Sequence, residues 1–108
     1  MKPIITKVSG VSYGDSQKLI KECMDSQIHF YSLTRENENP FDPRAVAVTL
    51  EGIYKLGYLP ADVARVVAPI IDKGTELVAE LVKFNTGKPG DLIGMTVRVV
   101  EAKKFHVG

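Results

Sequence analysis

The sequence contains only one cysteine and no long apolar run. Cys23 alone cannot form an intramolecular disulfide. No segment approaches the roughly 18 consecutive apolar residues that a membrane-spanning helix needs. The start of the chain, MKPIITKVSG, lacks an apolar stretch of signal-peptide length. We therefore predict a cytoplasmic protein with no membrane association.

An excess of charge of one sign is also missing. The 14 basic and 13 acidic residues leave a formal net charge of +1. Domains that coat nucleic acid through bulk charge usually have a pI above about 9, so this mode of binding is excluded, whereas a small local basic patch is not. Hydrophobic residues make up 44% and charged residues 25% of the 108 residues. These values predict one globular domain, residues 1–108, whose core needs no disulfide or metal.

The sequence lacks the spacings that are typical of metal sites and phosphate-binding loops. Its candidate metal ligands are Cys23, His29 and His106, but no CxxC or HxxxH pattern occurs, and structural zinc needs four ligands at recognisable spacing. In TGKPG, residues 86–90, Val82 stands where a P-loop has its first glycine, and Pro89 stands where it has the Ser or Thr that binds magnesium. We therefore expect a hairpin loop there, no metal site and no cofactor.

Catalytic groupings are equally weak. Cys23 lies on the apolar face of a predicted helix, where a thiol usually acts as a small hydrophobe. No general base can be assigned to Ser9 or Ser12, and no pair of carboxylates stands out from ordinary surface acids. We therefore predict that the protein is not an enzyme.

Strand and helix patterns alternate along the rest of the chain. β-branched and alternating apolar residues predict six strands, and apolar residues at helical spacing predict two helices. Asp15 or Ser16 can cap the first helix, Pro60 fits the first turn of the second, and Pro69 should kink or end that helix early. The expected order is strand 4–8, helix 13–24, strand 27–35, strand 44–50, strand 53–59, helix 60–73, strand 76–84 and strand 92–105.

This order predicts an α+β domain that is mostly β. Several short strands with two short helices are typical of an OB-like or SH3-like curled sheet or small barrel of about six strands. Strands 44–50 and 53–59 are joined by Glu51 and Gly52, which predicts a hairpin. In the last strand, the alternation predicts inward side chains at Ile93, Met95, Val97 and Val99.

A series of short motifs then follows in a fixed order. Arg35-Glu36 precedes NPFDP at residues 39–43, AVAV follows at residues 45–48, and GYLP at residues 57–60 leads into the apolar helix. Before them, TKVSGV precedes the first helix. The series resembles the HIRAN domain family over roughly residues 4–73, and less distinctly over the remainder. The chain is therefore interpreted as a stand-alone HIRAN domain.

The resemblance implies a barrel with two helices that binds nucleic acid without catalysis. Members occur fused to helicases or nucleases, and also alone, which implies a role in DNA repair. In the best understood fused members the domain holds the free 3′ end of single-stranded DNA. In the family pattern the aromatic residue after NP stacks on a base, and the next aspartate accepts a hydrogen bond from the 3′-hydroxyl. These residues are Phe41 and Asp42 here. The residue after the glycine of GYLP lies near the phosphates and is Tyr58. The implied partners are single-stranded DNA and a separate helicase or nuclease.

The chemistry of these residues fits such a ligand. One aromatic ring gives sequence-tolerant stacking worth about 1–3 kcal/mol per base. A carboxylate repels phosphates, so Asp42 beside Phe41 suits a chain end with a free hydroxyl and penalises a 3′-phosphate. Cations near these residues would offset repulsion from the internal phosphates. Proximity in the sequence nominates Arg44, Lys55 and Arg65.

Structural roles for the same residues stay open. Asp42 can close a turn with Asn39, Phe41 can plug one end of the barrel, and Tyr58 can be structural. The alternative function is a protein-interaction or structural module, or an accessory subunit, that has lost the DNA-end pocket.

Several positions depart from the DNA-binding members. Pro3 and Ile4 stand where those members have a basic residue and an aromatic residue, and Ala61 and Asp62 stand where they have a lysine. The lysines that could compensate are Lys2, Lys7, Lys103 and Lys104.

Overall fold

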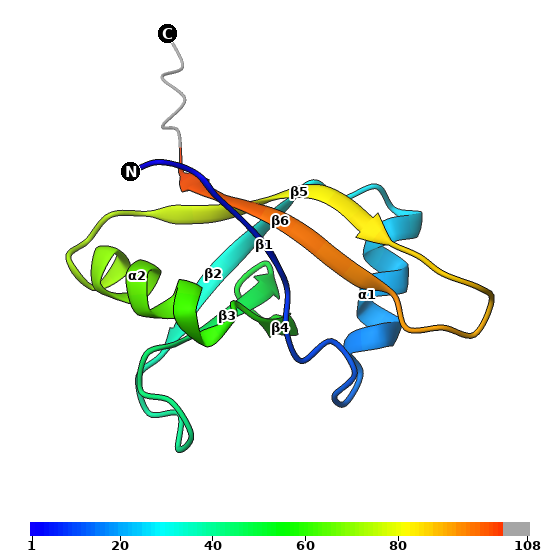
Figure 1. Cartoon of the computed structure of the whole chain (residues 1–108), viewed down its shortest axis with the longest axis horizontal. Helices are drawn as coiled ribbons and strands as arrows, with labels where there is room; N and C mark the ends of the chain where they lie inside the picture. Colours follow the sequence, from blue (N-terminus) through cyan, green and yellow to red (C-terminus); the bar gives the residue numbers. More distant parts are fainter. Residues whose placement is uncertain (103–108) are drawn as a thin grey trace, which may run out of the picture.

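The predicted order of strands and helices is confirmed by the computed structural model, which describes residues 1–102 (Figure 1). The predicted continuation of the last strand, with Lys103, Lys104 and the metal candidate His106, lies outside the described residues. The elements are β1 (Ile4–Lys7), α1 (Ser16–Asp25), β2 (Phe30–Glu36), β3 (Ala45–Leu50), β4 (Tyr54–Tyr58), α2 (Ala61–Asp72), β5 (Leu77–Asn85) and β6 (Gly94–Glu101).

All six strands form one antiparallel sheet in the order β1-β6-β5-β2-β3-β4. The predicted hairpin of β3 and β4 is present, with Ala47 opposite Tyr58. The sheet curls until its two edges meet, because Ser9, which follows β1, pairs with Tyr58 of β4. Their two backbone N–H groups donate reciprocally to the two carbonyls, at 2.7 and 2.8 Å. The predicted OB-like, mostly β architecture is therefore confirmed.

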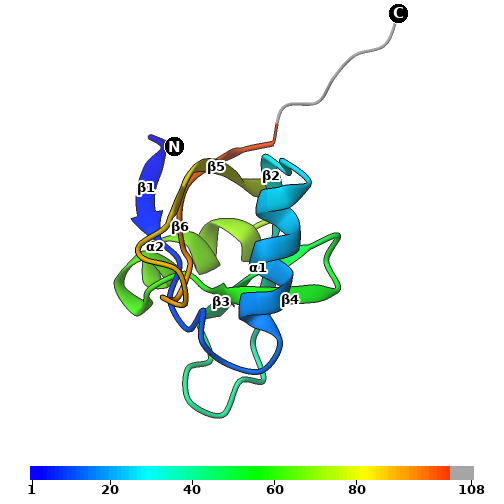
Figure 2. The same ribbon diagram turned by 90° about the vertical axis from the view of Figure 1, so that its right-hand side faces the viewer.

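The interior of the curled sheet is filled by side chains from alternate strand positions. Met95, Val97 and Val99 of β6 are buried as predicted, and Ile93 is half-buried just before the strand. The two helices flank the curled sheet at its two ends, α2 on the left and α1 on the right in Figure 1, and α1 faces the viewer in Figure 2. They add the buried residues Ile20 and Cys23 from α1 and Ala64, Val67 and Ala68 from α2. Each large apolar side chain buried in this way contributes roughly 1.5–3 kcal/mol, so the core needs no disulfide.

Neither helix of the described part of the chain has both the length and the apolar character to cross a bilayer.

Neither predicted side-chain cap of α1 is present, and of the two effects expected of Pro69, the early end of α2 is wrong. Asp15 is the N-cap residue of α1, but its side chain makes no capping hydrogen bond, and Ser16 is buried inside the first turn. The backbone of Asp15, with φ −89° and ψ 10°, is not in the extended conformation from which an N-cap side chain reaches the first amides. Pro69 does not end α2, which continues to Asp72. Pro69 and Arg65, whose carbonyl loses the helical bond, are both exposed, so water can replace that bond.

Candidate nucleic-acid interface

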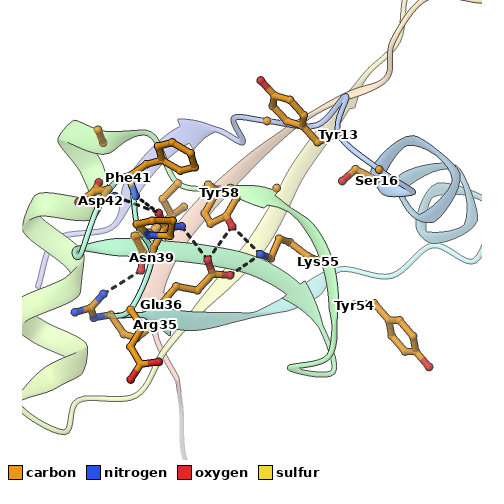
Figure 3. Close-up of a pocket in the computed structure, with 18 of the residues that line it drawn as sticks. Tyr13, Ser16, Arg35, Glu36, Asn39, Phe41, Asp42, Tyr54, Lys55 and Tyr58 are labelled. Atoms are coloured by element: carbon orange, nitrogen blue, oxygen red, sulfur yellow. Dashed lines mark hydrogen bonds and ion pairs between the residues drawn. The ribbon is translucent and has the colours of Figure 1, made fainter.

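An open groove of about 1440 Å³ runs beside β4. The loop between β2 and β3 lines one side of it, from Asn37 to Asp42, and the segment that leads into α1 lines the other, from Tyr13 to Ser16. Tyr54, Lys55 and Tyr58 of β4 line the groove between these two segments (Figure 3). Three elements that are distant in sequence therefore meet at this site.

The loop that carries Phe41 and Asp42 is held in shape by two side chains of its own. The Asn39 Oδ1 atom accepts hydrogen bonds from the backbone N–H groups of Phe41 and Asp42, at 2.9 and 3.1 Å. One Asp42 carboxylate oxygen accepts from the backbone N–H of Arg44 at 2.9 Å. Such side chain-to-backbone bonds are typical of Asn and Asp in turns. The NPFDP motif is therefore a stiff bend.

Arg35 ties this bend to the rest of the domain. Its guanidinium donates to both carboxylate oxygens of Asp72 in α2, at 2.9 and 3.2 Å. It also donates to the carbonyls of Pro43 and Ala45, at 3.1 and 3.0 Å. The hydrogen bonds from Arg35 hold the pKa of Asp72 below its usual value. Because the fork geometry of arginine suits several planar acceptors at once, this one residue fixes the end of the loop against both α2 and β3.

The Asp42 side chain takes part in the hydrogen bonding of the fold, whereas the Phe41 side chain is not packed in it. The Phe41 side chain is 95% exposed, so the structural alternative, in which it plugs one end of the barrel, is wrong. Asp42 closes a turn through its Oδ1 atom, as the structural alternative predicted. Its Oδ2 atom accepts no hydrogen bond from residues 1–102. A solvent-facing ring and one carboxylate oxygen therefore stand side by side at the groove (Figure 3).

Tyr58 and Lys55 are linked to Glu36, an acid that belongs to the motif series but was not nominated as a site residue. The Tyr58 hydroxyl donates to Glu36 at 2.8 Å, and the Lys55 ammonium contacts Glu36 and the Tyr58 oxygen, each at 2.6 Å. Asn39 also donates to Glu36, at 3.1 Å. Burial by itself raises the pKa of Glu36, but the hydrogen bonds from Lys55, Tyr58 and Asn39 outweigh it and hold that pKa below its usual value. The bonds to Glu36 and Tyr58 raise the pKa of Lys55.

The three nominated cations are not brought together in the groove. Lys55 lines it but is paired with Glu36, and its ammonium lies 4.8 Å from the centre of the Tyr58 ring. Arg44 and Arg65 are exposed and do not line the groove. Arg65 lies one helical turn beyond Ala61, which does line it, so the two share one face of α2. Arg65 is therefore a rim residue.

The groove has more acidic than basic side chains. Four acids and two bases line it, which leaves a formal balance of two negative charges. Both bases are already paired, Arg35 with Asp72 and Lys55 with Glu36. This balance opposes the entry of several phosphates. The acids are Asp15, Glu36, Glu38 and Asp42.

Two aromatic residues of the groove were missed by the sequence analysis. Tyr13 is 77% exposed and Tyr54 is 49% exposed, and both line the groove. Figure 3 shows Tyr13 and Phe41 on either side of Tyr58. The available signal was the segment GVSYG, in which Gly10 and Gly14 both adopt positive φ, at 68° and 54°. Such glycines mark a turn, and Tyr13 lies within it.

Of the positions that depart from the DNA-binding members, Ala61 lines the groove and the other three do not. Pro3 is exposed and Ile4 packs against the core, and neither lines the groove. Asp62 is exposed and bonds to the N–H of Val63 in its own helix. Lys2 and Lys7 are exposed but do not line the groove.

The candidate metal ligands do not converge within residues 1–102, where no group of three or more His, Cys, Asp or Glu side chains is arranged to hold a metal ion. Cys23 is buried and unpaired with another cysteine, and burial raises the pKa of its thiol. His29 is exposed.

Comparison with known proteins places this geometry in a family. A protein from Lactobacillus plantarum, solved by a structural genomics consortium, superposes with a TM-score of 0.66 at 21% identity, over 91% of this chain and 96% of that one. The HIRAN domain of human HLTF superposes with a TM-score of 0.57 at 18% identity, over 89% and 74%. No curated protein sequence matches the chain. The family model of the HIRAN domain matches residues 4–102, and the chain belongs to the HIRAN domain family.

Proposed function

We propose that the chain is a non-catalytic module that binds the 3′-hydroxyl end of single-stranded DNA in the groove beside β4. Membership of the HIRAN family supports a nucleic-acid-binding role. The observation that carries the finer proposal is the pairing of an exposed ring, Phe41, with a neighbouring carboxylate oxygen of Asp42 that accepts no bond from the described residues.

Each of the two residues has a separate task. The Phe41 ring stacks on the terminal base and contributes about 1–3 kcal/mol without regard to base identity. The Asp42 Oδ2 atom accepts a hydrogen bond from the terminal hydroxyl, while Oδ1 keeps its bond to the N–H of Arg44. The stiff bend set by Asn39 holds both groups in place, so little ordering is needed when the ligand binds.

The acidic lining makes the end of the strand the preferred ligand. A 3′-phosphate would bring its charge close to Asp42 and Glu36, and at about 4 Å two such charges repel by roughly 1–4 kcal/mol. A terminal sugar with a free hydroxyl carries no charge at that position. The nearest phosphate lies on the 5′ side of the terminal sugar and leaves the groove, outside which Arg44 and Arg65 are exposed.

The test is fluorescence anisotropy with oligothymidylates of about eight nucleotides, labelled at the 5′ end and carrying either a 3′-hydroxyl or a 3′-phosphate. We expect the hydroxyl end to bind about tenfold tighter, in line with a repulsion near 1.4 kcal/mol. Phe41→Ala should weaken both ligands. Equal affinity for both ends would overturn the proposal.

Two variants of Asp42 separate its roles. Asp42→Asn keeps one oxygen, which can close the turn, but places an NH2 group, which cannot accept a hydrogen bond, in the position of Oδ2. The loss of the negative charge should raise the affinity for the 3′-phosphate, and the loss of the Oδ2 acceptor should lower the affinity for the 3′-hydroxyl. Asp42→Ala should have the same two effects and should also lower stability, because the turn loses its acceptor. If Asp42→Asn leaves the ratio of the two affinities unchanged, the carboxylate does not read the strand end.

The acidic lining also favours a second candidate, a protein-interaction module that takes a basic segment. Four acids and three exposed aromatic rings, those of Tyr13, Phe41 and Tyr54, suit lysine and arginine side chains. Absence of oligonucleotide binding at ~50 mM salt, where phosphate contacts are strong, together with binding of an arginine-rich peptide that Glu38→Gln weakens, would select this candidate.

A further inference from the structure

The outer face of β1, β6 and β5 carries the positive charge that the groove lacks. Lys7 and Lys83 are both register partners of Thr96, so the three residues form one row across three neighbouring strands. Register partners in antiparallel strands point to the same side of the sheet. Both lysines are exposed, and neither forms an ion pair within residues 1–102.

The next row on the same face adds apolar surface. Ile5 pairs with Arg98, Arg98 with Glu80, and Glu80 with Phe30 of β2. Ile5 and Phe30 are each 61% exposed, although large apolar side chains usually face inward. The only acid in the two rows, Glu80, is paired with Arg98 at 3.1 Å. The two rows together therefore hold three cations against one acid, the opposite balance to that of the groove.

This face continues into the groove. Ile5, Lys7 and Ser9 alternate along the chain on one side and are all exposed. Ser9 pairs with Tyr58, and the next residue, Gly10, lines the groove. Two residues of extended chain span about 7 Å, so Lys7 lies about 7 Å along β1 from Ser9, which adjoins the groove. Lys83 lies about 10 Å further on, across β6, because neighbouring strands are roughly 4.8 Å apart.

We propose that this outer face is a second nucleic-acid contact surface, on which Lys7 and Lys83 bind phosphates and Phe30 stacks on a base. The occupant is the part of a single strand that precedes the end held in the groove, and in this respect the inference rests on the proposed function. Charge complementarity selects this occupant, because the groove repels the phosphates that the outer face attracts. An exposed aromatic ring beside cations is the usual composition of a surface that follows a single strand.

The test compares oligothymidylates of about four and about twelve nucleotides, both with a 3′-hydroxyl. The short ligand fills the groove alone, and the long one also reaches the outer face. We expect the double variant Lys7→Gln/Lys83→Gln to bind the short ligand as the unmodified protein does. For the long ligand, the slope of log affinity against log salt should fall by about 1.4, because each phosphate contact on a single strand contributes about 0.7. Phe30→Ala should weaken the long ligand about tenfold.

A matched control removes the same charge elsewhere. The double variant Lys73→Gln/Lys88→Gln changes two exposed lysines that lie outside both surfaces, so it should leave the salt slope for the long ligand unchanged. If the two double variants lower the slope equally, the outer face has no special role and the inference is overturned. Competition by inorganic polyphosphate as strong as that by the long oligonucleotide would also overturn it, because the surface would then bind any polyanion.

Failure of the groove proposal can be distinguished from failure of the outer-face inference. If the 3′-phosphate ligand binds as well as the 3′-hydroxyl ligand, the groove proposal fails, but a length-dependent affinity that Lys7 and Lys83 control would still support the outer face. If end preference is intact and length dependence is absent, the outer face fails alone. All substituted side chains are exposed, and unchanged urea midpoints would verify that the variants fold.

Discussion

Gly57→Ala should strain the point at which the curled sheet meets its own edge. Gly57 precedes Tyr58 in β4, and the chain at Val8 and Ser9 passes directly over it. An added Cβ atom would lie 2.6 Å from Val8 Cγ1 and would also press against the carbonyl oxygen of Ser9. That oxygen accepts the N–H of Tyr58 at 2.8 Å, so the backbone cannot move away without stretching the bridge.

The expected loss follows from these contacts. Two backbone hydrogen bonds hold the bridge, at 2.7 and 2.8 Å, and each contributes about 0.5–1.5 kcal/mol. Overpacking typically costs a further 1–3 kcal/mol, and the lower entropy of the unfolded alanine chain offsets about 0.4–1 kcal/mol. We therefore expect Gly57→Ala to lower the free energy of unfolding by about 2–4 kcal/mol. In urea, where the slope is about 1–3 kcal/mol per molar, the midpoint should fall by roughly 1 M or more.

Gly94→Ala is the matched control. Gly94 also lies in a strand, but an added Cβ would meet only Asn85, at the ordinary contact distance of 3.5 Å. Its unfolding midpoint should stay the same or rise slightly, since the unfolded chain loses freedom. If Gly57→Ala and Gly94→Ala unfold within about 0.5 kcal/mol of each other, the close approach at Ser9 does not constrain the fold and the reasoning is refuted.

Three further substitutions test the groove and the core. Asn39→Ala removes the acceptor for two backbone N–H groups, so it should lower the free energy of unfolding by about 1 kcal/mol and weaken the preference for a 3′-hydroxyl end. The control Asn37→Ala, at an exposed position, should do neither, and equal effects of the two substitutions would contradict a role for the bend. Glu36→Gln should reduce the loss of stability as the pH falls below the ordinary glutamate pKa of 4.5, because a carboxyl whose pKa is lowered by folding stabilises above its unfolded pKa and loses that contribution as the pH falls through its folded pKa. If the stability of Glu36→Gln and of the unmodified protein falls in parallel with pH, the hydrogen-bond network around Glu36 does not stabilise the fold. Tyr31→Phe removes a 2.8 Å hydrogen bond to the Ile28 carbonyl and should lower the free energy of unfolding by about 1 kcal/mol. Its affinity for oligonucleotides should not change, because Tyr31 lies in the core; an unchanged urea midpoint would contradict the contribution of this bond.

Most of the fold was predictable because local pattern and tertiary environment agree in this chain. The alternation of Met95, Val97 and Val99 matches the face of β6 that is buried. The predicted start of β2 was wrong, because its first two expected residues form the end of α1. Gln27 was expected in β2, but it has a φ of 56° and Ile28 donates back to the Cys23 carbonyl, so both complete the end of α1. Propensity does not reveal such a cap, because it depends on a single left-handed residue.

The site was predictable only where it is local. The bend is encoded by the five consecutive residues from Asn39 to Pro43, and its hydrogen bonds join residues at most three positions apart. The groups that surround it come from far along the chain: Arg35 reaches Asp72, and Glu36 reaches Tyr58. Proximity in the sequence therefore nominated Lys55 as a phosphate-binding cation, but it could not show that Lys55 already forms an ion pair with Glu36.

The opposite charges of the two surfaces give a physical reason for reading a strand by its end. A groove in which acids outnumber bases repels a run of phosphates, so an internal stretch of DNA gains nothing by lying in it. Only the terminus offers an aromatic base and a hydroxyl donor without a second phosphate behind them. Lys7 and Lys83, on the outer face, can hold the rest of the strand without weakening this selection, because they lie outside the groove. In the two proposals, discrimination and attraction are therefore assigned to different parts of one small sheet.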